Sequence, residues 1–152
     1  MYKGLFDRVG KKLTISDIKS VETSIGCKLP EDLVRHYMIY NGGQPNKNIF
    51  LDDDESEYEV NTFLRMKYKA GPLDVIFEDT VEVIKNNKQL LPESFFPFAR
   101  DSGGNFYCIN DIDNNIYYCE MDCFENNSCR LTNIAINIEE FIHALQDENE
   151  IY

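Results

Sequence analysis

The N-terminal part of the chain carries the apolar periodicity of two amphipathic helices. In "TISDIKSVETSIG", apolar residues recur three or four positions apart after a threonine or serine that can cap a helix, and Gly26 fits a left-handed stop. In "LPEDLVRHYMIYNGG", Pro30 fits the first helical position, two acids follow it, and an Asn-Gly-Gly triplet ends the pattern. These features predict two helices at the start of the chain.

The middle of the chain changes from a period of two to a helical period. Residues 58–64 alternate in character, which predicts a strand. Within residues 74–87, Phe77, Val81 and Ile84 recur at helical spacing, which predicts a middle helix.

Strand patterns dominate from residue 95 onward. "FFPFARDS" is apolar up to two glycines, and "NFYCIN" and "IYYCEM" flank the turn sequence "DIDNN", so residues 106–121 are predicted as a β-hairpin. A further strand is expected near residues 130–136, and "NIEEFIHALQ" has the apolar stripe of a closing helix. Mostly adjacent antiparallel strands with helices grouped apart predict an α+β fold, and the length suits one domain over residues 1–152.

A tetrad of small residues, Ser102-Gly103-Gly104-Asn105, lies between two of these predicted strands. Glycines beside small polar residues can cradle phosphate, but such a loop lies between a strand and a helix, and the Gly-Lys-Ser/Thr of a P-loop does not follow. The glycines are therefore predicted to provide the backbone freedom of a tight corner. No nucleotide or other cofactor is expected.

Charge and composition narrow the classes of function. The sequence has 27 acidic and 15 basic residues and a net charge of −12, which repels nucleic acids and anionic membranes and favours cations or a basic protein partner. The alternative interpretation is that the acidic surface only keeps the protein soluble. No stretch approaches the roughly 20 apolar residues of a membrane span, and the first residues contain no apolar run of signal-peptide length. The five cysteines are odd in number, and a chain of this length needs no disulfide framework. We expect a reduced, cytoplasmic protein with no nucleic-acid or membrane partner.

Candidate catalytic chemistry is sparse in this sequence. There are two histidines: His36 is predicted on the polar side of its helix, near Asp32 and Arg35, and His143 is predicted to lie beside acids on the closing helix. Neither adjoins a recognisable nucleophile motif. An enzyme whose site is built from residues distant in the sequence is the less favoured alternative.

Three cysteines form an incomplete zinc pattern. Cys119, Cys123 and Cys129 lack the two paired knuckles of common zinc sites, and no histidine joins them. Cys108 and Cys119 fall in predicted strands, where small buried thiols are ordinary core residues. No zinc site is predicted.

The hairpin turn carries an incomplete calcium pattern. Asp111, Asp113 and Asn115 alternate, and Asp122 stands at the twelfth position, but the glycine of position six is missing and the flanks are predicted strands rather than helices. Turn chemistry is the preferred interpretation, because asparagine tolerates a positive φ. No metal ligand is predicted.

Several of these motifs occur together in an order that resembles the SUKH superfamily, which includes the Smi/Knr-type cell-wall assembly regulators of fungi and many small bacterial proteins. The similar features are the Leu-Pro of "LPEDLVRHYMIYNGG", its terminal Asn-Gly-Gly, the apolar "PFA" that leads into a Gly-Gly-Asn corner, the hairpin ending in "IYYCEMD" and the closing helix. Together they cover roughly residues 14–145. Length and acidity also resemble a single-domain bacterial immunity protein, although the family's frequent tryptophans are absent.

The resemblance implies both a fold and a binding function. The implied fold is a sheet of about six mostly antiparallel strands, with the N-terminal, middle and C-terminal helices packed against it. Bacterial members are typically encoded beside polymorphic toxins, often nucleases, and neutralise them by direct binding. We therefore expect an immunity protein that occludes the active site of one cognate toxin with an acidic surface. The alternative is a regulatory protein-interaction module like the fungal relatives; no catalytic residues are implied, and the oligomeric state is left open.

A dense acidic segment is the candidate contact surface for such a partner. Six carboxylates lie within residues 52–59, with an aromatic residue before them and another among them. One interpretation is a solvated loop. The other is a partner-facing surface, because complementary charge raises association rates to about 10⁸ M⁻¹s⁻¹ or more, and aromatic side chains can anchor a complex. The predicted partner-binding residues are Phe50, Asp52, Asp53, Asp54, Glu55, Glu57 and Tyr58, with Asp111 and Asp113 of the hairpin as the second choice.

Overall fold

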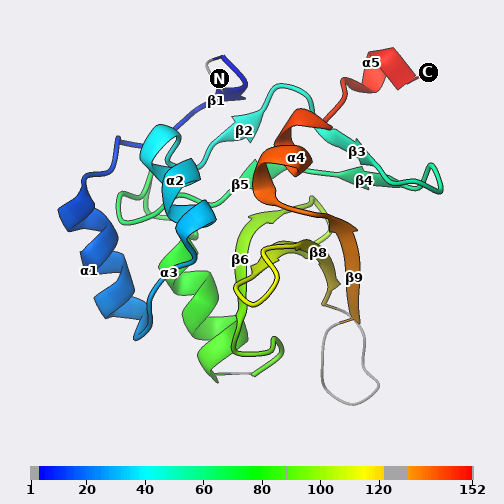
Figure 1. Cartoon of the computed structure of the whole chain (residues 1–152). Helices are drawn as coiled ribbons and strands as arrows, with labels where there is room; N and C mark the ends of the chain where they lie inside the picture. Colours follow the sequence, from blue (N-terminus) through cyan, green and yellow to red (C-terminus); the bar gives the residue numbers. More distant parts are fainter. Residues whose placement is uncertain (1–3, 88, 122–129, 152) are drawn as a thin grey trace.

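The computed structural model describes residues 4–87, 89–121 and 130–151, and it shows the predicted α+β architecture (Figure 1). In this view the N-terminal helices lie to the left of a central antiparallel sheet, and a two-stranded hairpin projects to the right. The first and last described elements, β1 and α5, lie near the top of the view.

The two predicted N-terminal helices are confirmed as α1 (Ile15–Ile25) and α2 (Glu31–Ile39). Thr14 caps α1 reciprocally with Asp17: the Thr14 side chain accepts from the Asp17 backbone N–H at 3.1 Å, and Asp17 Oδ2 accepts from the Thr14 N–H at 2.9 Å. Gly26 follows α1 with a φ of 81°, the left-handed stop that the sequence predicts. Local capping therefore sets the bounds of α1.

The central sheet has five antiparallel strands in the order β5-β6-β7-β8-β9, where about six were expected. They are β5 (Thr62–Phe63), β6 (Phe95–Arg100), β7 (Phe106–Asn110), β8 (Ile116–Glu120) and β9 (Arg130–Ala135). Two small ladders accompany it: β1 (Phe6–Asp7) with β2 (Gln44–Pro45), and β3 (Ile49–Leu51) with β4 (Glu57–Glu59). The strand predicted over residues 58–64 is divided between β4 and β5, because the chain passes from the hairpin to the sheet at the buried Val60.

The middle and closing helices pack against this sheet. The middle helix begins as α3 (Phe77–Thr80) and continues with a wider turn as the π-helix η1 (Val81–Asn87). The closing helix is α4 (Ile138–His143), whose N-cap Asn137 accepts from the Glu140 N–H at 2.8 Å, and the short α5 (Glu148–Ile151) follows.

The Asn-Gly-Gly triplet after α2 joins the helices to the sheet. Asn41 Nδ2 donates to the carbonyls of Lys11 and Met66 at 2.8 and 3.0 Å, and Asn41 Oδ1 accepts from the Met66 N–H at 2.7 Å. Gly42 and Gly43 have φ angles of 72° and 113°, and a Cβ on Gly43 would lie 2.7 Å from the Asp7 carbonyl oxygen. The glycines are required because the backbone of neighbouring segments approaches this closely.

His36 lies in the core, which corrects its predicted place on the polar side of α2. Its side chain is 1% exposed, and its ring centre lies 5.3 Å from that of Phe63 and 5.7 Å from that of Phe6. The prediction fails because β1 and β5 cover a second side of α2, which helical periodicity alone does not reveal. Burial lowers the pKa of His36 to about 3, so the imidazole is neutral at physiological pH.

Candidate functional site

The acidic segment folds as the turn of the β3–β4 hairpin, and Asp52 organises it. Asp52 Oδ1 accepts hydrogen bonds from the backbone N–H groups of Asp54 and Ser56, both at 2.9 Å. The Asp52 N–H donates to the Ser56 carbonyl at 3.2 Å, and Glu55 takes the left-handed conformation with a φ of 61°. The Asp52 carboxylate therefore fixes the turn from within, which is a common role for aspartate.

Four carboxylates project from this turn into solvent. Asp53, Asp54, Glu55 and Glu57 are exposed, whereas Asp52 is half-buried. Within the described part of the chain, no Lys or Arg forms an ion pair with Asp53, Asp54 or Glu55. Because like charges at this spacing repel one another, the turn concentrates a negative potential that an incoming cation would relieve.

Phe50 lies inside the protein, so its ring is not available to a partner as the sequence interpretation requires. It is 5% exposed, and its ring centre lies 5.3 Å from that of Phe141 in α4. Tyr58 is its direct partner across the hairpin ladder and is only half-buried. Tyr58 is therefore the aromatic residue of the hairpin that retains an accessible surface.

Tyr58 also connects the hairpin to the central sheet. Its ring packs edge-on against Tyr118 of β8, with 5.2 Å between ring centres, and its hydroxyl donates to Asp52 Oδ2 at 3.3 Å. Burial raises the pKa of Tyr58, and the negative charges of Asp52 and Glu120 raise it further. Both tyrosines and Glu120 are half-buried, so this junction forms a partly open aromatic surface beside the exposed acids.

The Gly-Gly corner, which includes Ser102 and lies between β6 and β7, is hydrogen-bonded to the β3–β4 hairpin. Glu59 Oε1 accepts from the Ser102 backbone N–H at 2.8 Å and from the Ser102 hydroxyl at 2.7 Å. The Tyr118 hydroxyl donates to Asp101 Oδ2 at 2.6 Å. The corner joins β6 and β7 as predicted, but only Gly104 has a positive φ, 91°, whereas Gly103 does not. Although burial opposes ionisation of Asp101, hydrogen bonds from Tyr118 and Asn105 lower its pKa, which keeps this carboxylate charged.

We define the acidic face as the hairpin residues together with the two β8 residues beside them. Sequence reasoning missed the β8 residues, although the alternation in "IYYCEM" places them on one side of their strand. The pairing of tyrosines from separate hairpins is a tertiary contact with no local sequence signal. The members of the acidic face are Asp52, Asp53, Asp54, Glu55, Glu57, Tyr58, Tyr118 and Glu120.

The structure does not bring Asp111 and Asp113 to the acidic face. They lie in the β7–β8 turn, next to the Ile109–Ile116 pair, whereas the Gly-Gly corner precedes β7 and lies at its other end. Asp113 Oδ1 accepts from the Asn115 N–H at 2.9 Å, and Asp113 Oδ2 accepts from the Tyr117 hydroxyl at 2.8 Å. Asp113 therefore stabilises its own turn, as hairpin chemistry predicts.

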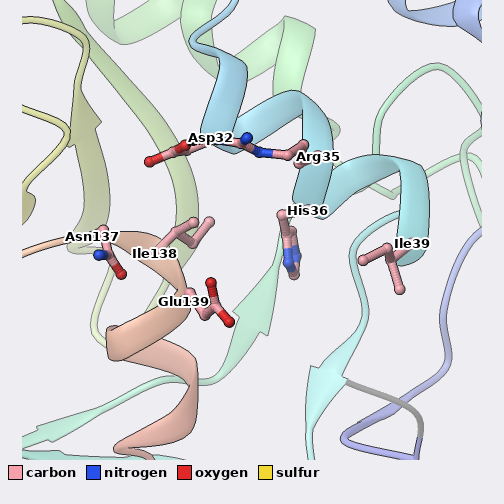
Figure 2. A pocket seen from close by; sticks show the side chains of 7 residues that line it. All are labelled: Asp32, Arg35, His36, Ile39, Asn137, Ile138 and Glu139. Atoms are coloured by element: carbon pink, nitrogen blue, oxygen red, sulfur yellow. Dashed lines mark hydrogen bonds and ion pairs between the residues drawn. The ribbon is translucent and has the colours of Figure 1, made fainter. Parts of the chain in front are cut away.

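A cavity of about 360 Å³ between α2 and the start of α4 is a second candidate site (Figure 2). Figure 2 shows His36 between Arg35 and Ile39 on α2, facing the start of α4. Arg35 is paired with Asp32. The lining residues, all within the described part of the chain, include no Ser, Thr, Cys or Lys that could act as a nucleophile. The buried, neutral imidazole of His36 therefore suits a packing role rather than proton transfer.

The described residues form neither a metal-binding group nor a membrane-spanning helix. None of their His, Cys, Asp and Glu side chains gather in threes or more as ligands for a metal ion would. Cys123, Cys129 and Asp122, which belong to the incomplete zinc and calcium patterns of the sequence, lie outside the described residues. Of the helices described, none has the length and apolar character to cross a bilayer.

The comparison with known families agrees with the motif order found in the sequence. Residues 12–144 match the family model described as SMI1 / KNR4 family (SUKH-1). The match runs from just before α1 to the end of α4, so it includes the acidic hairpin and the Gly-Gly corner. No curated protein matches the chain.

Proposed function

Because the chain belongs to the SMI1 / KNR4 family (SUKH-1), we propose that it is an immunity protein that binds and neutralises a cognate bacterial toxin. The observation that carries this proposal is the acidic face, where exposed carboxylates stand on a hairpin that hydrogen bonds fix to the central sheet. A rigid charged surface loses little conformational freedom on binding, which favours a fast and specific encounter.

The partner that suits this surface is a basic protein, such as the catalytic domain of a nuclease. A nuclease holds its substrate with Lys and Arg that neutralise phosphate charges. A set of carboxylates fixed on a hairpin can cover the same cations, so that the toxin loses access to nucleic acid. Tyr58 and Tyr118 would supply the anchoring contact, because a guanidinium or ammonium group stacks favourably on a tyrosine ring.

Family membership also supports a second candidate function, a regulatory protein-interaction module outside any toxin system. The two candidates differ in their genetic setting. An immunity protein is encoded beside a large gene whose C-terminal domain is a toxin, whereas a regulatory module is not. An enzyme is not proposed, because none of the residues lining the cavity between α2 and α4 is a hydroxyl, thiol or amine nucleophile.

Co-expression with the toxin domain encoded beside this gene tests the proposal. The parent chain should restore growth, and the variant Asp53→Asn/Asp54→Asn/Glu55→Gln/Glu57→Gln should protect poorly although it folds normally. The matched control neutralises four exposed acids elsewhere, at Asp7, Glu82, Glu93 and Glu139, and should protect like the parent. Equal protection by both variants would contradict a role for the acidic face, and no protection by the parent would contradict the immunity function.

A further inference from the structure

Two cysteine thiols meet inside the sheet, on the side opposite to the acidic face. Cys108 of β7 and Cys119 of β8 are reduced, and their sulfur atoms lie 3.1 Å apart. Both side chains are 0% exposed and belong to a small apolar cluster that also contains Phe95. The separation is within reach of an S–H···S contact and only about 1 Å longer than an S–S bond.

Lys85 is a buried lysine whose charge interacts with that of Cys108. It lies on the π-helix η1 and is 7% exposed, and its Nζ stands 3.7 Å from the centre of the Phe96 ring. Within the described part of the chain it forms no ion pair. Burial lowers the pKa of Lys85, and the charges of Cys27, Glu93, Cys108 and Asp111 oppose this shift. A cation near a buried thiol favours the thiolate, which is the reactive form of cysteine.

We propose that Cys108 and Cys119 form a reversible dithiol that hydrogen peroxide oxidises to a cross-strand disulfide, with Lys85 as the positioning residue for the Cys108 thiolate. The Cys108 thiolate attacks one peroxide oxygen, the O–O bond breaks, and the departing hydroxide takes the proton that the thiol released. Cys108 is then a sulfenic acid and one water has formed. The Cys119 sulfur attacks the Cys108 sulfur, the S–O bond breaks, and the hydroxyl leaves as a second water with the Cys119 proton.

The geometry favours a reversible crosslink rather than a permanent one. The strand register pairs Cys108 with Tyr117 and Cys119 with Phe106, so the two cysteines are diagonal neighbours. Diagonal neighbours have Cα atoms about 7–8 Å apart, beyond the roughly 4.4–6.8 Å that an unstrained disulfide spans. Strained disulfides are readily reduced and are the labile, regulatory kind. Cys119 also lies between Tyr118 and Glu120, so its crosslink would shift the strand that carries part of the acidic face.

Mass mapping of the full-length protein tests the crosslink. The reduced chain is treated with stoichiometric hydrogen peroxide, remaining thiols are blocked with N-ethylmaleimide, and proteolytic fragments are analysed. We expect a Cys108–Cys119 linkage with the loss of two hydrogen atoms, reversed by dithiothreitol and absent from Cys108→Ala and Cys119→Ala. Sulfinic acid at either cysteine without a linkage, or a main product that links Cys27, Cys123 or Cys129 instead, would overturn the proposal.

The rate of oxidation tests the role of Lys85 separately. Lys85→Met retains most of the buried stem and removes the charge, and it should slow linkage about tenfold, because the Cys108 thiolate loses a neighbouring cation. Lys85→Arg keeps the charge and should retain most of the rate. The matched control is Lys28→Met, because Lys28 is exposed and lines a cavity together with Phe96, the ring that Lys85 contacts. This variant should oxidise at the parental rate. If Lys85→Met, still folded by circular dichroism, oxidises as fast as the parent, Lys85 does not position the thiolate.

Discussion

The variant Phe50→Ala shows whether Phe50 is a core residue or a surface anchor, because the two roles predict different losses in the free energy of unfolding. Phe50 is 5% exposed and lies between Tyr58, at 6.3 Å between ring centres, and Phe141, at 5.3 Å. Removing the ring loses about 2–3 kcal/mol of apolar burial. The cavity left behind adds to this, for a total of about 3–5 kcal/mol. That is a large part of the roughly 5–15 kcal/mol that stabilises a typical domain.

Equilibrium unfolding in urea measures this loss. At a slope of about 1.5 kcal/mol per M, the midpoint of Phe50→Ala should fall by about 2–3 M while the slope stays unchanged. Leu73→Ala is the matched control, because Leu73 is 93% exposed and its truncation should change stability by less than about 0.5 kcal/mol. A loss below about 1 kcal/mol for Phe50→Ala would refute its place in the core and restore it as a candidate contact residue.

Three further predictions concern the Gly-Gly corner, the Asp101 hydrogen-bond network and metal binding. Gly104→Val should lower the free energy of unfolding by about 1–3 kcal/mol, because the φ of Gly104 is 91°, whereas Gly103→Ala should be tolerated. Equal losses for the two variants would contradict this difference. A calorimetric signal with ATP would contradict the structural role of the corner. Hydrogen bonds hold the pKa of Asp101 below its usual 3.8 against the opposing effect of burial, so its contribution to stability is complete above about pH 5 and is lost as the pH falls through the folded-state pKa. Because Tyr118→Phe removes one of these hydrogen bonds, its stability should fall less steeply in acid than that of the parent. If the stability of both proteins falls equally with decreasing pH, the Tyr118 hydrogen bond does not lower the pKa of Asp101. Prolonged EDTA treatment should leave the melting temperature unchanged, and a drop that one metal ion restores would show a metal site.

Local signals predicted most of the elements. The capping threonine, Gly26 and the apolar spacing define α1, and the alternation around "DIDNN" defines the β7–β8 hairpin. The alternation also places Tyr107 and Cys108 on opposite faces of their strand, and in the structure Tyr107 packs in the main core and Cys108 in a smaller cluster. These predictions succeed because each depends on interactions among residues close in sequence.

The failures have a common physical cause, because each depends on contacts between distant segments. His36 is buried by Phe6, which belongs to a strand too short to be recognised in the sequence. Phe50 is covered by Phe141 from the closing helix. The Tyr58–Tyr118 contact joins two separate hairpins. Periodicity identifies the residues that need burial or exposure, but it does not identify which distant element covers them.

The association rate of the chain with its toxin domain tests the central proposal most directly. Stopped-flow binding is measured at low and high salt for the parent, for Asp53→Asn/Asp54→Asn/Glu55→Gln/Glu57→Gln, and for the control with four acids neutralised elsewhere. The account predicts that the acidic-face variant associates several-fold more slowly at low salt and depends less on salt, whereas the control stays close to the parent, because screening acts on the charges that steer the encounter. If the acidic-face variant associates as fast as the parent at low salt, the hairpin acids do not face the partner, and the proposed binding surface is wrong.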